Sequence, residues 1–153
     1  MDEMYLKMIL ALTDEFFDGW EWNAGDRAIL LDDHYKREVL VINTHYQIIS
    51  SRVAKLLFPG SLEGCKTEEH ITRLRPLPSQ EQLQKMLIDF ENKDSKYKHS
   101  NYFIISERFI AVVIEGDLVA DMENKTLTEM WLEFVVYLMR NKTWNGTKWI
   151  KNI

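Results

Sequence analysis

The sequence has few of the residues that usually mark a chemical site. Cys65 is the only cysteine among 153 residues, so one chain can form neither an internal disulfide nor a cluster of thiolate metal ligands. The six glycines are scattered, and no phosphate-binding loop or dinucleotide-binding glycine motif can be written from them. Because a lone cysteine suits a reducing compartment, we expect a cytoplasmic protein.

The chain also lacks a basic excess and a long apolar run. Its 19 basic and 24 acidic residues give a net charge of −5 and are mixed along the whole length. Nucleic-acid-binding proteins usually show the opposite balance. The first residues, MDEMY, carry acid where a signal peptide carries base, and the most apolar run, Leu127 to Met139, is too short to span a bilayer. We therefore expect no membrane association and no general affinity for nucleic acid.

What is present is the composition of a globular protein, with 46% hydrophobic and 28% charged residues. Short stretches rich in valine and isoleucine alternate with longer stretches whose apolar residues lie three or four apart. We predict an α+β fold, with antiparallel strands and about three helices. The length suits a single domain over residues 1–153.

Three segments have helical spacing, and two of them open with a strong cap signal. Ser79 stands three residues before Gln82, and Thr126 stands three residues before Glu129. Each pair can exchange side-chain-to-backbone hydrogen bonds as a capping box. Asp2 can cap the first segment. The predicted helices span residues 2–17, 80–91 and 127–141.

The third predicted helix is apolar nearly all round. Glu129, Glu133 and Arg140 form its only polar edge. A helix of this kind must be covered on most sides. We therefore expect it either to be the central helix of the fold or to form a subunit interface. In the second case the protein would self-associate through residues 127–141, for example as a homodimer.

Short apolar stretches between turn signals predict strands. The first three follow one another as an antiparallel meander, and HITRLRP predicts a fourth. YFIIS and RFIAVVIE are further stretches of β character, whereas residues 58–69 and 91–101 are predicted to be loops. The predicted strands span residues 27–32, 37–43, 45–50, 70–76, 102–106 and 108–115.

Four of the five tryptophans lie in two short segments, DGWEWNAGD and KTWNGTKWI. We interpret their rings as core residues, since buried aromatic side chains dominate core energetics. The alternative is an exposed aromatic surface that binds a ligand or a partner. The candidate binding residues are Trp20, Trp22, Trp144 and Trp149.

The second of these segments predicts a hairpin. Asn-Gly between β-prone residues favours a two-residue type I′ turn, which needs positive φ at both central positions. Such a turn would pair Trp144 with Thr147 and would place Trp149 opposite Lys142. The two indoles would then project from opposite faces of the ribbon.

Candidate catalytic and metal-binding residues are sparse. The histidines His34, His45, His70 and His99 all lie more than four residues apart, so a helical zinc pair is absent. No Gly-x-Ser-x-Gly motif is present, and a lone cysteine in a loop is more often incidental than nucleophilic. We therefore predict no catalytic residue, no metal ligand and no cofactor.

Two acidic clusters and one basic stretch leave other chemistries open. Asp32, Asp33, Glu68 and Glu69 each precede a histidine closely, and a hard cation could join them, although each cluster is also typical of a solvated turn. KDSKYKHS surrounds a tyrosine with bases and could contact single-stranded nucleic acid, although acidic neighbours dilute its charge.

Several stretches together resemble a loosely defined group of small uncharacterised proteins of bacterial phages and prophages. The matching stretches are LRPLPSQEQLQKML, TLTEMWLEFVVYLM and WNGTKWI, and GDRAILL is similar to a strand entry in the same group. The resemblance implies a bacterial host cell and a shared fold. It implies no reaction, because the shared residues are those that capping, packing and turns require.

Two functions follow from these observations as hypotheses. The first is a non-enzymatic protein-interaction or regulatory module, favoured by seven Met, seven Phe, six Tyr and five Trp without a catalytic constellation. Its partner would be an unknown protein or a second copy of the chain. The second is a small metal-dependent hydrolase or nucleic-acid-acting protein that uses the four clustered carboxylates.

Overall fold

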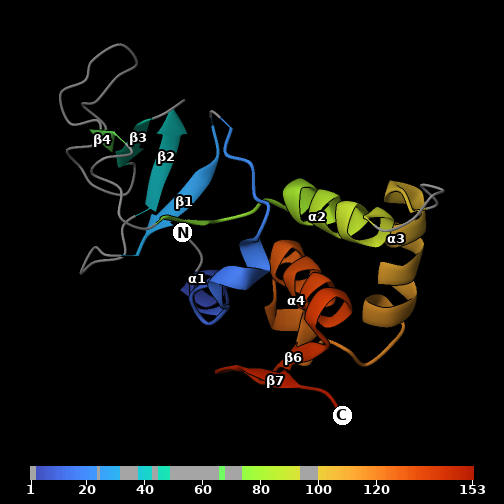
Figure 1. Ribbon diagram of the computed structural model, residues 1–153. Coiled ribbons are helices and arrows are strands. Elements are labelled where there is room, and N and C mark those ends of the chain that lie inside the picture. The colour runs from blue at the N-terminus through green and yellow to red at the C-terminus, as the bar shows by residue number, and fades with distance from the viewer. Residues whose placement is uncertain are drawn as a thin grey trace. The chain divides into compact units, whose positions relative to one another are not determined.

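The computed structural model describes residues 3–23, 25–31, 38–42, 45–48, 66–67, 74–93 and 100–153 (Figure 1). The chain divides into two units: unit 1 comprises Met1–Leu12 and Ser79–Ile153, and unit 2 comprises Thr13–Pro78. Helices and antiparallel strands are both present, so the predicted α+β class is confirmed. The single domain over residues 1–153 stays a prediction.

Unit 2 contains an antiparallel sheet in the order β4-β3-β2-β1-β5. The predicted meander is confirmed, since β1 pairs with β2 and β2 pairs with β3. The loop predicted over residues 58–69 is wrong at residues 66–67, which form β4; the rest of that loop lies outside the described residues. The strands are β1 (Arg27–Leu30), β2 (Glu38–Ile42), β3 (His45–Ile48), β4 (Lys66–Thr67) and β5 (Leu74–Pro76).

Strand β5 brings a distant part of the chain to the edge of this sheet. Pro76 lies opposite Ala28 of β1, and the backbone N–H of Leu77 donates to the carbonyl of Arg27 at 2.9 Å. Proline lacks the N–H that a central strand must donate on both sides, so an edge position suits it. The short helix η1 (Asp14–Phe17) contacts β5 within the same unit.

The helix predicted over residues 2–17 is wrong at residues 11–13. Helix α1 covers only Glu3–Leu10, and η1 is a separate turn of 3-10 helix. Of the apolar stripe predicted for this segment, Met4 is 37% exposed and the other members are buried; those members are Tyr5, Met8, Ile9, Leu12 and Phe16. The helix ends because the backbone of Thr13 is extended, with φ −85° and ψ 161°, and Thr is typical of the position before a new helix. Asp2, the predicted cap, lies outside the described residues.

Unit 1 is mainly helical, with a hairpin of β6 and β7 beside its last helix. The capping box at the start of α2 is confirmed: Ser79 N–H donates to Gln82 Oε1 at 2.9 Å, and Gln82 N–H donates to Ser79 Oγ at 3.2 Å. The elements of this unit after α1 are α2 (Gln80–Asn92), α3 (Tyr102–Phe109), the π-helix η4 (Ile110–Ile114), the 3-10 helix η5 (Met122–Asn124), α4 (Leu127–Arg140), β6 (Lys142–Trp144) and β7 (Trp149–Lys151).

The strands predicted over residues 102–106 and 108–115 are wrong, because these residues form α3 and η4. Their side chains follow a helical period, with Ile105, Phe109 and Val113 buried four residues apart. The β-branched composition therefore misled the prediction, and packing overrode propensity. A cap signal precedes the segment: the side-chain oxygen of Asn101 accepts from the N–H of Ile104 at 3.0 Å. The middle of the predicted 91–101 loop lies outside the described residues, and its start belongs to α2.

Helix α4 is the central helix of unit 1, where it packs against α1, α2, η4 and β6 (Figure 1). Trp131 stacks on Phe109 with ring centroids 4.1 Å apart, and both rings are buried. Thr126 caps the helix by accepting from the N–H of Glu129 at 3.1 Å. The polar edge predicted along this helix is wrong for Glu129 and Glu133, since each is only 2% exposed.

A buried ion pair explains how one of these carboxylates is accommodated. Lys125 Nζ lies 2.8 Å from Glu133 Oε2, and both side chains are almost fully buried. Burial raises the pKa of Glu133, while the hydrogen bond and charge of Lys125 oppose that rise and the nearby Glu129 adds to it. In the described part of the chain, no helix combines the length and apolarity that a membrane crossing needs.

Candidate functional site

The four candidate tryptophans form two pairs, one in each unit. Trp144 and Trp149 belong to the hairpin of unit 1, with ring centroids 5.1 Å apart. Trp20 and Trp22 belong to unit 2, with ring centroids 6.0 Å apart. The two pairs differ in exposure, and each contains one buried indole nitrogen, that of Trp144 or of Trp20, without a hydrogen-bond partner among the described residues.

The register predicted for the hairpin is wrong. Trp144 lies directly opposite Trp149, so both rings are on one face of the ribbon. The turn is longer than two residues because the side-chain oxygen of Asn145 accepts from the N–H groups of Thr147 and Lys148, both at 2.9 Å. Gly146 supplies the positive φ that this turn needs, at +102°.

The hairpin pair has a packing role in unit 1. Trp144 is 5% exposed, and Trp149 Nε1–H donates to the carbonyl oxygen of Met8 at 3.0 Å, a contact that ties the end of the chain to α1. Buried indole nitrogens usually find such a partner, but that of Trp144 has none among the described residues. For these two rings the geometry favours the interpretation as core residues.

The pair in unit 2 is more open. Trp22 is 40% exposed, whereas Trp20 is half-buried. Their planes meet at 68°, and the ring of Phe17 meets that of Trp20 at 83° with centroids 6.4 Å apart. The three rings thus pack edge to face, with no parallel slot between them.

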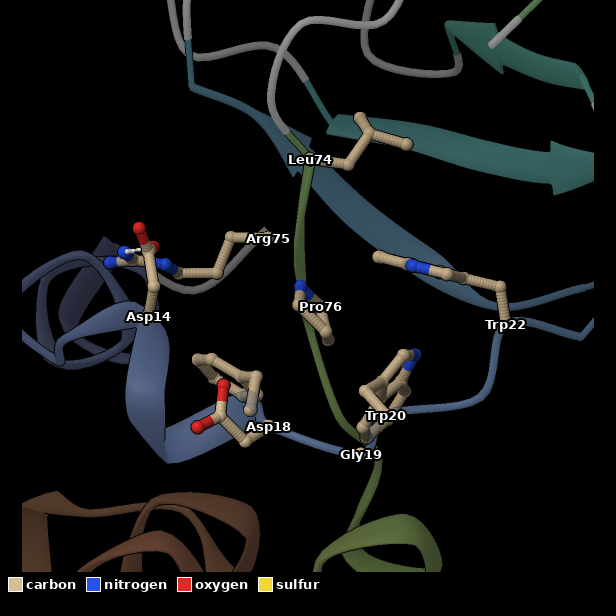
Figure 2. A pocket seen from close by; sticks show the side chains of 9 residues that line it. Asp14, Asp18, Gly19, Trp20, Trp22, Leu74, Arg75 and Pro76 are labelled. Carbon is tan, nitrogen blue, oxygen red and sulfur yellow. Dashed lines mark hydrogen bonds and ion pairs between the residues drawn. The ribbon is translucent and has the colours of Figure 1, made fainter.

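These rings line a pocket of about 380 Å³, which lies wholly within unit 2 (Figure 2). Gly19 adopts φ +83°, and the N–H of Trp20 donates to the carbonyl of Phe17 at 3.0 Å, so a tight turn brings the indoles beside η1. The lining residues are Asp14, Phe17, Asp18, Gly19, Trp20, Trp22, Leu74, Arg75 and Pro76. We call this the aromatic pocket.

An ion pair closes one side of the aromatic pocket. Arg75 of β5 pairs with Asp14 of η1, which fixes the short helix against the sheet edge. The side chain of Arg75 is only 7% exposed, whereas that of Asp14 is 69% exposed. Figure 2 shows this pair and Asp18 on the side of the pocket away from Trp22. The pocket therefore has an aromatic side and a charged side.

A second turn fixes the position of Trp22. The backbone N–H of Asn23 donates to the carboxylate of Asp26 at 2.8 Å, and Asp26 is buried just before β1. An aspartate that bonds the backbone in this way stabilises a tight turn. The exposed ring of Trp22 is thus attached to a well-defined strand entry.

The indole nitrogen of Trp20 is the least expected feature of the pocket. Trp20 Nε1 is buried, and among the residues that the structure describes it has no hydrogen-bond partner. Figure 2 shows this nitrogen on the side of the ring that faces Trp22. An unmet buried donor carries a desolvation penalty of about 1–3 kcal/mol, so a native structure that keeps one calls for an explanation.

Sequence reasoning identified Trp20 and Trp22 but missed the partners across the pocket. Asp14 comes from η1, and Arg75 and Pro76 come from β5, which only its pairing with β1 brings to this place. Pro76 in a stretch with strand character was an available signal, because it predicts an edge strand.

Most of the predicted metal candidates cannot be placed. Among the residues with a described position, no group of three or more histidine, cysteine, aspartate or glutamate side chains is arranged to hold a metal ion. The metal-dependent alternative rests on residues that lie outside the description, and it stays a prediction. Those residues are Asp32, Asp33, His34, Cys65, Glu68, Glu69, His70 and His99; of the other candidates, His45 lies in β3.

Comparison with known proteins gives no match for this chain among family models, curated proteins or solved structures. The resemblance to phage and prophage proteins therefore stays a prediction.

Proposed function

We propose that this protein is a non-enzymatic interaction module that binds a partner protein through the aromatic pocket of unit 2. The observation that carries the proposal is the exposed indole of Trp22 beside the buried Trp20 Nε1–H, which has no partner among the described residues. Tryptophan is enriched among residues that dominate binding energy, where a partner desolvates the ring.

The pocket is also held in place in the way that a binding site requires. The Arg75–Asp14 pair and the bond between Asn23 and Asp26 fix both of its sides before any partner arrives. A preformed site loses less conformational freedom on binding than a flexible one. This arrangement supports recognition, and the charged groups of the described lining are Asp14, Asp18 and Arg75.

The partner is proposed to be a different protein, because the surface predicted for self-association is occupied. The large apolar side chains of α4, including Trp131 and Phe134, are buried, and α4 packs against the other helices of unit 1. Leu127, at 47% exposure, is the one large apolar side chain of α4 that reaches solvent to this degree. A dimer through residues 127–141 would have to unpack unit 1.

The cellular setting of the proposal is the cytoplasm of a bacterial host, in the service of a phage or prophage. It is supported by the resemblance of the three quoted stretches and by the lone cysteine. Regulation of a host or phage protein would fit a small module without a catalytic constellation.

The test is affinity purification of the tagged full-length chain from bacteria, with and without phage infection, read by mass spectrometry. Trp22→Ala removes the exposed indole of the pocket. Phe103→Ala is the matched control, because Phe103 is an exposed aromatic residue of unit 1, at 70% exposure.

We expect a stoichiometric protein with the wild type and with Phe103→Ala, and its loss with Trp22→Ala. Recovery of the bait alone under both conditions would contradict the proposal. A partner that is retained by Trp22→Ala and lost with Phe103→Ala would move the binding surface to α3.

A further inference from the structure

We infer that the aromatic pocket takes an extended, proline-containing segment of the partner that carries a basic side chain. The inference rests on the proposed function and names the chemistry of its ligand. Three features of the pocket support it independently: the tilt of the rings, the unmet indole donor and the position of the carboxylates.

The ring geometry selects against a flat aromatic ligand and in favour of compact rings. The planes of Trp20 and Trp22 meet at 68°, so a flat base or aromatic side chain has no parallel slot between them. A pyrrolidine ring is small and puckered, and it packs on one tilted face at a time. Pro-rich segments are recognised in this way by grooves lined with aromatic side chains.

The unmet donor requires a ligand that brings an acceptor without bringing another donor. Trp20 Nε1–H has no partner among the described residues and lies on the side that faces Trp22. The backbone carbonyl next to a proline is such an acceptor, since proline has no N–H that would need an acceptor of its own. A polyproline II segment also keeps its carbonyls free of internal hydrogen bonds. Because Trp20 Nε1 is buried, the exposed ring of Trp22 must move when the segment binds.

The charged side of the pocket selects a cation. Asp18 is exposed, and among the described residues no group binds its side chain, whereas the nearby Arg75 is already paired with Asp14. A basic residue of the ligand would lie near Asp18 while its prolines contact the indoles on the opposite side. The net charge of −5 favours the approach of a basic segment as well.

The direct test uses three blocked peptides with the full-length chain. Pro-Pro-Arg-Pro-Pro carries both features, Ala-Ala-Arg-Ala-Ala lacks the rings, and Pro-Pro-Glu-Pro-Pro reverses the charge. Binding is followed by the indole N–H signals in proton–nitrogen NMR spectra, which are assigned with single tryptophan-to-phenylalanine variants. We expect the first peptide to bind about tenfold more tightly than either of the others, which corresponds to about 1.4 kcal/mol.

Three site variants and one control sharpen the result. Trp22→Ala should weaken the binding of the first peptide about 30-fold, as loss of a central aromatic contact does. Asp18→Asn should weaken it about threefold, because an exposed charge pair contributes little, and should reduce the preference over the glutamate peptide. Phe103→Ala should leave the affinity unchanged. Trp22→Phe keeps a ring and should retain part of the affinity.

The signal of Trp20 Nε1–H should move downfield on binding, as expected of a new hydrogen bond. Equal affinity for all three peptides, or shifts at Trp144 and Trp149 in place of Trp20 and Trp22, would overturn the inference. So would the absence of any binding at millimolar peptide.

The affinity purification separates this inference from the proposed function. One outcome is a partner that is captured through Trp22 and yet contacts the pocket without a proline or basic residue. That result would support the interaction module and contradict the inferred proline-containing, basic ligand. Binding of the first peptide without any captured protein would contradict the proposed function and support the inferred chemistry of the pocket.

Discussion

The two tryptophan pairs have the same residue type and similar ring separations, but they are placed in opposite ways. In the hairpin of unit 1, Trp144 is buried and the nitrogen of Trp149 bonds the carbonyl of Met8. In unit 2, Trp22 is exposed and the nitrogen of Trp20 is unmet among the described residues. The first pair is explained by packing within its unit. Trp20 and Trp144 each have a buried indole nitrogen without a partner among the described residues, so what sets the second pair apart is the exposed ring of Trp22 and the pocket beside it, which a partner can cover.

The largest expected difference between the pairs is in stability. Trp144→Ala should lower the free energy of unfolding by about 3–5 kcal/mol, because it empties a buried aromatic site. Trp22→Ala should change it by less than about 1 kcal/mol, since the ring is 40% exposed. Urea unfolding followed by circular dichroism measures both. Equal losses would mean that the ring of Trp22 is a structural element of unit 2.

A smaller difference concerns the indole nitrogens alone. Trp149→Phe keeps a ring but removes the donor to Met8, and it should cost about 1 kcal/mol. Trp20→Phe removes a donor without a partner among the described residues, so the loss should be near zero once the change in ring size is allowed for. The midpoints of urea unfolding of the two variants, each compared with the wild type, measure these losses. A large loss for Trp20→Phe alone would show that its nitrogen is bonded in solution.

Loss of a helix cap in unit 1 should lower the free energy of unfolding by a comparable amount. Ser79→Ala removes an acceptor from the N-terminus of α2 and should cost about 0.5–2 kcal/mol. Because Ser79 lies in unit 1, outside the aromatic pocket, the same variant should leave the capture of a partner unchanged. A capture that fails with Ser79→Ala at full stability would place part of the binding surface on α2.

The smallest expected effect is a pH dependence that belongs to unit 1. Burial raises the pKa of Glu133 above its ordinary value of 4.5, so the unfolded chain ionises at lower pH than the folded one. The contribution of this group to stability is therefore fully present at acid pH and is lost as the pH rises through the raised pKa. The wild type should lose stability relative to Glu133→Gln over that interval. Unfolding midpoints taken across the interval test this, and a wild type that gains stability relative to Glu133→Gln as the pH rises would contradict it.

The parts of the fold that the sequence predicted are those set by local chemistry. Ser79 and Gln82 cap α2 as expected, and the three strands of the meander pair as expected. The failures occurred where packing or side-chain hydrogen bonds decided the outcome. The β-branched residues of η4 are helical because the segment buries every fourth side chain, and the hairpin register is set by the side chain of Asn145.

The site was half predicted for the same reason. Trp20 and Trp22 share one glycine-punctuated segment, so the sequence could place them together. Arg75 and Pro76 reach the pocket only through the pairing of β5 with β1, a long-range contact that no local pattern encodes. The exposure of one indole pair and the burial of the other also depend on tertiary packing.

The most direct test of the central claim compares the two pairs in one sample. Indole N–H signals of the labelled full-length chain are recorded in buffer and in clarified bacterial lysate, with and without phage infection. Recognition through the aromatic pocket predicts that the signals of Trp20 and Trp22 shift or broaden more than the others in lysate. The signal of Trp149 should be unchanged, because its indole N–H is bonded to Met8. Changes confined to Trp144 and Trp149, with Trp20 and Trp22 unaffected, would contradict the assignment of binding to unit 2.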